Sequence, residues 1–191
     1  RHRLYQVETT GYFDVVSADL AFAGTRNDFF PGVTTWLATG LPDVKQHPVV
    51  VIGGSGRANR RLVPLSQAKE VIPKIAVSAG PSRGAVLSEE IGNNYFAAKV
   101  AVERESMLLL KATYHPNWRA TVNGVKTDTV MLMPSFVGIQ LSPGEHEVRI
   151  EYRPRGLRVI LLSLGLLSLL LIWIVEKRGG SLRRWFGLRG L

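Results

Sequence analysis

The longest apolar segment of the chain covers residues 157–175. Between 159 and 175 there is no charged residue, and Ser163 and Ser168 are the polar positions. Because a helix rises 1.5 Å per residue, 157–175 would span about 28 Å, close to the hydrocarbon thickness of a bilayer. The segment is apolar on all sides, so it offers no polar face to water. The pattern predicts a transmembrane helix over 157–175.

The flanks of this segment suit a membrane interface. An arginine at the start can extend toward the headgroups, and a tryptophan near the end fits the aromatic belt. The basic tail 176–191 mixes arginines with apolar residues, which fits an interfacial segment on anionic lipid and equally a disordered tail. The predicted membrane-anchoring residues are Arg158, Trp173, Lys177, Arg178 and Trp185.

Charge gives a weak indication of orientation. Five Lys and Arg residues follow the apolar segment and four precede it or lie at its start, a difference that barely discriminates. We expect a membrane protein with the large domain extracytoplasmic and the C-terminus cytoplasmic.

Residues 1–155 consist mainly of short apolar segments separated by turn residues, the pattern of strands. Two short helices are predicted, over 34–39 and over 66–72, the second with Ser66 as its N-cap. The spacing of strands and turns predicts an antiparallel β-sandwich over 1–155. The expected strands cover 4–8, 13–16, 49–52, 75–77, 97–102, 107–114, 119–122, 125–127, 129–133, 136–141 and 146–152.

The turns of the last third are the most specific. Asn123-Gly124 is the preferred dipeptide of a type I′ hairpin, and Pro143-Gly144 fits a type II turn. From 146 to 152 the residues alternate, which predicts a strand with one buried face and one solvated face. Only three residues, 154–156, join this strand to the apolar segment, so the domain must sit on the membrane or on neighbouring membrane helices.

The net charge of +9 over 191 residues first suggests a nucleic-acid or membrane partner. Its distribution decides between them, because 153–191 carries eight basic residues and one acid while 1–152 is close to balanced. The excess surrounds the apolar segment, so nucleic acid is excluded as a partner and the lipid bilayer is favoured. The chain lacks cysteine, which rules out disulfides, thiolate metal sites and cysteine catalysis. It begins at Arg1 with no visible signal peptide, so we expect a piece of something longer.

No arrangement of residues predicts a catalytic centre, a metal site or a cofactor. Gly54-Ser55-Gly56 follows an apolar strand and imitates a dinucleotide-binding loop, but the third glycine is missing and no βαβ unit is expected around it. The four histidines show no metal-ligand spacing. Glu89-Glu90 is interpreted as solvated surface, and Glu103 and Glu105 as an exposed strand edge.

Two groups of residues are candidates for ligand contact. Arg57, Arg60 and Arg61 could meet the phosphate of a lipid or of a lipid-linked substrate, although a solvated loop is the simpler interpretation. The rings of Trp36, Tyr114 and Trp118 could stack on a sugar, although such residues are more often part of a β-sandwich core.

The C-terminal part of the chain resembles a known family. The segments that carry the resemblance are YHPNWRATVNG at 114–124, FVGIQL at 136–141, PGEHEV at 143–148 and YRP at 152–154, before the apolar segment. Their pattern resembles the C-terminal region of YfhO-like proteins of the bacterial cell membrane, which are large multi-span proteins similar to GT-C-type glycosyltransferases that use lipid-linked sugars. Asn117 and Asn123 stand where the family usually has glycine and aspartate, and both still suit turns.

The resemblance implies an exported domain with a supporting or acceptor-binding role in lipid-linked glycosyl transfer. The upstream spans of the family and the loop that carries its catalytic acid have no counterpart here, so no catalytic residue carries over. The sequence therefore predicts three parts: an extracytoplasmic domain at 1–155, a span at 157–175 and a basic tail at 176–191. The alternative is a single-span accessory or scaffolding subunit of a larger membrane complex.

Overall fold

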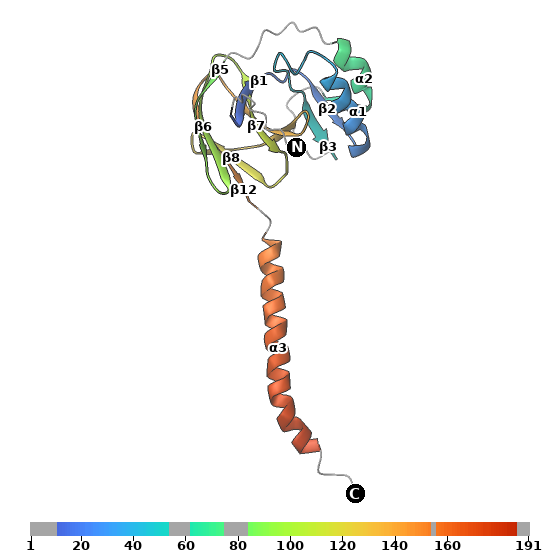
Figure 1. Cartoon of the computed structure of the whole chain (residues 1–191), viewed down its shortest axis with the longest axis vertical. Helices are drawn as coiled ribbons and strands as arrows, with labels where there is room; N and C mark the ends of the chain where they lie inside the picture. The colour runs from blue at the N-terminus through green and yellow to red at the C-terminus, as the bar shows by residue number, and fades with distance from the viewer. Residues whose placement is uncertain (1–10, 54–61, 75–83, 154–155, 187–191) are drawn as a thin grey trace, which may run out of the picture. The chain divides into compact units, whose positions relative to one another are not determined.

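The computed structural model describes residues 11–53, 62–74, 84–153 and 156–186. The chain divides into two units, 1–153 and 154–191, and each is described by itself (Figure 1). The first unit holds two β-sheets, and the second is a helix.

The larger sheet has seven strands in the order β1-β7-β11-β10-β3-β2-β4. From β1 to β3 every neighbouring pair is antiparallel, whereas β2 pairs in parallel with both β3 and β4. Its strands are β1 (Phe13–Val16), β2 (Ala21–Gly24), β3 (Val49–Ile52), β4 (Leu62–Pro64), β7 (Ser106–Thr113), β10 (Val130–Leu132) and β11 (Phe136–Leu141).

The smaller sheet has five strands in the order β5-β6-β12-β8-β9, and all its pairs are antiparallel. Its middle strand, β12, pairs with β6 along eight residues and with β8 along five. The strands are β5 (Gly84–Ile91), β6 (Tyr95–Val102), β8 (Trp118–Val122), β9 (Val125–Thr127) and β12 (Gly144–Tyr152).

The main core contains residues from both sheets. Val148 and Ile150 of β12 are fully buried, and they belong to the same cluster as Leu108 and Leu110 of β7 and Ile139 of β11. Since side chains alternate along a strand, burying the even-numbered positions of β12 leaves the odd-numbered positions on the outer face. The predicted fold class, mainly β with antiparallel-rich sheets and one C-terminal apolar helix, is confirmed.

The parallel part of the larger sheet was not predicted. Helix α1 (Arg26–Leu37) connects β2 to the parallel strand β3, which makes a βαβ unit. The helix begins well before the expected segment 34–39, at a capping box in which Asp28 accepts bonds from the backbone N–H and the hydroxyl of Thr25. The expectation that no βαβ unit surrounds Gly54-Ser55-Gly56 is therefore wrong. The next element after these residues is strand β4, and not the helix that a dinucleotide-binding loop requires.

The second predicted helix is broken into short pieces. They are η1 (Leu65–Gln67), α2 (Ala68–Val71) and η2 (Ile72–Lys74), and Figure 1 shows α2 beside α1. Ser66 lies inside η1 and caps no helix, because the chain turns into the helical segment at Pro64. Leu65 packs so closely on β2 that a Cβ at Gly24 would come within 2.5 Å of the Leu65 Cβ.

The second unit is the helix α3 (Leu157–Phe186). Within it, Val159–Lys177 is long and apolar enough to cross a membrane, with a mean hydropathy of 2.5. The helix continues beyond the segment expected to span and takes in much of the segment expected as a separate tail. Of the anchoring candidates, Lys177 places its Nζ 4.9 Å from the ring centre of Trp173, while the side chains of Arg158, Arg178 and Trp185 lie outside the described structure.

The hairpin between β8 and β9 has the turn conformation that the sequence predicts. Asn123 and Gly124 have φ of 52° and 80°, as a type I′ turn requires. A Cβ at Gly124 would meet nothing within 4 Å, so a substitution there acts through backbone strain alone. Gly124→Val should lower the stability of the domain by about 1–2 kcal/mol. Gly124→Asn should lose less, since asparagine tolerates this conformation, and equal melting temperatures for the wild type and the valine variant would contradict the turn.

A charge in the middle of α3 tests the span. Leu167→Arg should raise the apparent free energy of insertion by about 3 kcal/mol, because a charged side chain in hydrocarbon loses its hydration. An insertion assay with engineered glycosylation sites measures this quantity, with Leu167→Ala as the uncharged control. Equal insertion free energies for the arginine and alanine variants, or failure of the wild-type segment to insert, would contradict the span over 159–177.

Candidate functional site

A cavity of about 1030 Å³ opens on the β unit, at the upper end of the size range of small-molecule sites. Two of the three aromatic residues predicted to stack on a sugar, Tyr114 and Trp118, line it. The third, Trp36, is buried in a separate cluster, where its Nε1 donates to the carbonyl of Gln46 at 2.8 Å. Trp36 is therefore a core residue, as the simpler interpretation of the sequence held, because its ring has no free face.

Trp118 is held in one orientation on the cavity wall. Its Nε1 donates a hydrogen bond of 3.0 Å to the carbonyl of Thr113. Its ring lies edge-on to Tyr152, with 5.1 Å between centroids, and 6.1 Å from the ring of Phe96. The side chain is half-buried, so its polar edge is satisfied within the domain while part of the ring remains accessible.

Four cations and two carboxylates share the same cavity. In the register of the sheet, Arg149 and Glu151 of β12 stand opposite Thr121 and Arg119 of β8, so these side chains project from one face. Lys126 comes from the edge strand β9, across from Thr121. The charged lining residues are Arg119, Lys126, Arg149, Arg153, Asp128 and Glu151.

Glu151 binds two of these cations. It accepts from Arg149 Nε at 2.7 Å and from Arg153 Nη2 at 2.9 Å. The hydrogen bond from Arg149, followed by that from Arg153, lowers the pKa of Glu151 below its ordinary value. The guanidinium of Arg149 also lies 3.7 Å from the ring centre of Tyr95, whose hydroxyl donates to Glu90. This network holds Arg149 in place and keeps Glu151 ionised.

The other two cations have no carboxylate partner in the part of the chain that the structure describes. Arg119 donates through Nη1 to the carbonyls of Pro116 and Trp118, at 2.9 and 3.2 Å. Lys126 is exposed on β9, at the edge of the sheet. Together with the group around Glu151, they leave the cavity net positive, since Asp128 is its only further acid.

Several residues weighed from the sequence lie elsewhere. Arg57, Arg60 and Arg61 fall outside the described residues. Glu90 is exposed as expected, whereas Glu89 is half-buried and its carboxylate accepts from the backbone N–H groups of Tyr12 and Phe13 at 3.0 and 2.9 Å. Glu103 and Glu105 lie in the turn between β6 and β7 and not on a strand edge.

The described histidines are occupied with local hydrogen bonds. His115 Nδ1 accepts from the backbone N–H of Asn117, and His146 Nε2 donates to the carbonyl of Ser142 at 2.8 Å. His47 donates through Nδ1 to the carbonyl of Met133, and burial lowers its pKa. Within the residues described, no group of three or more histidines and acids is placed to hold a metal ion.

Sequence reasoning missed the charged side of the cavity. The alternation over 146–152 assigned Arg149 and Glu151 to a solvated face, but it did not indicate which strand lies beside them. The pairing of β8 with β12 joins segments that are about 30 positions apart, and it places Arg119 opposite Glu151. The register of the Asn123-Gly124 hairpin was the available signal, since it sets Lys126 across from Thr121.

Comparison with known proteins identifies one family. Residues 83–163 match the model of the family described as bacterial membrane protein YfhO. The match covers less than half of the chain, from the start of β5 into α3, and the resemblance to YfhO-like membrane proteins is confirmed over that range. No curated protein and no solved structure matches the chain.

The ion pairs of Glu151 predict that its pKa changes when either arginine is replaced. Arg149→Gln should raise the pKa of Glu151 toward its ordinary value, and Arg153→Gln should raise it less, because the bond from Arg149 is the larger cause. Carbon-13 NMR of labelled glutamate carboxyl groups measures both midpoints. Lys99→Gln is the control, since Lys99 stands opposite Glu147 on the same sheet. Equal midpoints in all these proteins would contradict the network.

The same pairing affects stability as a function of pH. A carboxyl whose pKa is lowered by folding stabilises the folded state above its unfolded pKa, and this contribution is lost as the pH falls through the lowered value. The stability difference between wild type and Arg149→Gln should therefore shrink under acid conditions.

Proposed function

We propose that this chain is the membrane-anchored extracytoplasmic domain of a YfhO-like protein, and that its cavity binds the anionic headgroup of a lipid-linked sugar. The proposed role is a supporting or acceptor-binding one in glycosyl transfer, with the catalytic centre outside this chain. The observation that carries the proposal is that half-buried aromatic residues and cations without a carboxylate partner among the described residues line one cavity, with Trp118 on the core side of β8 and Arg119 on its outer side.

The two kinds of lining residue match the two parts of such a headgroup. A flat apolar ring face, as on Trp118 and Tyr114, complements the C–H face of a sugar ring. Arginine and lysine bind phosphate oxygens through charge-assisted hydrogen bonds, and Arg119 and Lys126 are free of carboxylates in the described structure. A neutral sugar alone would leave these cations without a partner.

The state of Glu151 favours binding over catalysis. A general acid or base needs a pKa near the working pH, whereas two arginines lower the pKa of Glu151 further from that range. Glu151 therefore acts in this proposal as a positioning residue that orients Arg149 and Arg153.

The membrane supports the choice of a lipid-borne ligand. The family that matches is one of membrane proteins, and the chain carries a helix long enough to span. The strand β12 ends at Tyr152, and α3 begins at Leu157, so the cavity belongs to a domain that cannot move far from the bilayer. An extracytoplasmic position follows from the resemblance, as part of the same proposal.

A second candidate function is that of a single-span accessory subunit in a membrane complex. It is supported by the outer face of α1, where Phe30 and Leu37 are 79% and 59% exposed. A shallow apolar depression lies beside them, lined by Pro31, Thr34 and Ala38 among others. Purification with another membrane protein at fixed stoichiometry, without binding of lipid-linked sugar, would favour this function.

Binding of a polyprenyl-phosphate hexose to the full chain in lipid nanodiscs tests the first proposal. Lys126→Gln and Arg119→Gln should each weaken binding about three- to tenfold, through the loss of one charge-assisted contact. Trp118→Leu should weaken binding at least as much, while Trp118→Phe, which keeps a ring, should lose less.

Two controls make the result specific. Lys99→Gln removes an exposed cation of the same sheet outside the cavity and should leave the affinity unchanged. An uncharged hexose lipid should bind weakly to every variant. Equal affinity for Lys126→Gln, Arg119→Gln and Lys99→Gln would contradict the assignment of the cavity.

A further inference from the structure

We infer that one end of the β unit is a lipid-contacting surface that rests in the headgroup layer of the bilayer. This surface, called here the aromatic end, consists of the turns 92–94 and 114–117 and the side chains that surround them. The inference rests on the membrane helix and on this surface, and it does not depend on what the cavity binds.

The aromatic end carries a continuous series of rings. Neighbouring centroids lie 5.3, 6.1, 5.1 and 5.7 Å apart along the series. Tyr12 and His115, at its two ends, are exposed, and the rings between them are half-buried. Ile91, 55% exposed, adds an aliphatic side chain at the end of β5. The rings, in order, are Tyr12, Phe96, Trp118, Tyr152 and His115.

Hydrogen bonds join the turns of this end into one surface. The N–H of Tyr152 donates to the carbonyl of Asn94 at 3.0 Å, and the N–H of Arg153 donates to the carbonyl of Asn117 at 3.1 Å. The last two residues of the domain are thus bonded to both turns. The chain leaves the domain in the middle of the aromatic end.

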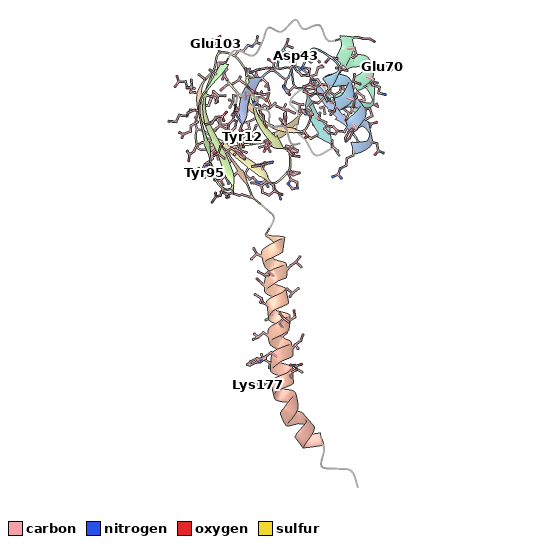
Figure 2. All side chains as sticks on the ribbon, in the orientation of Figure 1. Tyr12, Asp43, Glu70, Tyr95, Glu103 and Lys177 are labelled. Carbon is pink, nitrogen blue, oxygen red and sulfur yellow. The ribbon has the colours of Figure 1, made fainter. Side chains whose placement is uncertain are left out.

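Charge is distributed unevenly between the two ends of the sheets. The turns 92–94 and 114–117 contain no acid, whereas Glu103 and Glu105 lie in the turn at the other end and Glu145 lies beside it at the start of β12. Figure 2 shows the separation, with Glu103 and Tyr95 labelled at opposite ends of β6.

Acids on the strands near the aromatic end are bound within the domain. Glu89 accepts from two backbone N–H groups, Glu90 accepts from the Tyr95 hydroxyl, and Glu151 accepts from two arginines. Asp128 lines the cavity. A surface with accessible rings, arginines and no acid in its turns is complementary to anionic headgroups, where tyrosine and tryptophan concentrate in membrane proteins.

The short linker between β12 and α3 indicates that the bilayer is what this surface contacts. Five residue steps separate Tyr152 from Leu157, where α3 begins, and they reach at most about 18 Å when fully extended. The headgroup region of each leaflet is roughly 5–7 Å thick. The aromatic end is therefore kept within reach of the headgroups of the membrane that α3 crosses.

The natural absence of cysteine allows a direct test on the full chain. Asn93→Cys lies in an exposed turn at the aromatic end, and Glu145→Cys lies at an exposed position of β12 at the other end, so neither disturbs the core. Each variant is labelled with the fluorophore NBD and reconstituted in vesicles of phosphatidylcholine and phosphatidylglycerol at a ratio of about 7:3. A fraction of the phosphatidylcholine carries the quencher TEMPO on its headgroup.

We expect quenching at Asn93→Cys to exceed quenching at Glu145→Cys at least threefold, and aqueous iodide to show the reverse order. Pro116→Cys in the turn 114–117 and Ser142→Cys in the β11–β12 turn form a second pair and should behave in the same way. Equal quenching by lipid within both pairs would overturn the inference. Protection of the Asn93→Cys and Pro116→Cys labels from both quenchers would also overturn it, since another protein surface would then cover the aromatic end.

Discussion

The pairing of β12 with both β6 and β8 is the interaction on which the rest of the structure depends. It places Val148 and Ile150 in the core that both sheets share, and both side chains are fully buried. Burying the side chains of a valine and an isoleucine contributes about 1.5–3 kcal/mol each, and a shift of register by one residue would exchange them with Arg149 and Glu151. The hydrophobic core therefore selects the register, and the register positions every charged group of the outer face.

The candidate site follows from this register. With Val148 and Ile150 inside, Arg149 and Glu151 face outward beside Arg119 and Thr121, and the cavity acquires its cations. The same strand ends at Tyr152, whose ring packs on Trp118 and whose N–H is bonded to the turn at Asn94. One strand thus connects the core, the cavity and the chain segment that enters the membrane helix. This connection is why ligand binding at the cavity and contact of the aromatic end with lipid are compatible proposals.

The sequence predicts those parts of the fold whose signal is local. The apolar segment, the alternation over 146–152 and the Asn123-Gly124 turn each depend on a few neighbouring residues, and each is found in the structure. Helix α1 carries Pro31, Gly32 and two threonines, so its helix propensity is poor, and tertiary packing of Gly32 and Trp36 stabilises it instead. The parallel pairing of β2 with β3 and β4 and the charged wall of the cavity depend on contacts between distant segments. Apart from the hairpin that sets Lys126 across from Thr121, no local pattern encodes those contacts.

Backbone hydrogen bonds order the domain up to Arg153, the last residue before the linker, and this order underlies the proposed contact with the membrane surface. Amide hydrogen exchange of the full chain in lipid nanodiscs measures this directly. We predict that the amides of Tyr152 and Arg153, bonded to the carbonyls of Asn94 and Asn117, are protected to the same degree as the interior of β12. Exchange of these two amides at the rate of an unstructured peptide, with the rest of β12 still protected, would contradict the account.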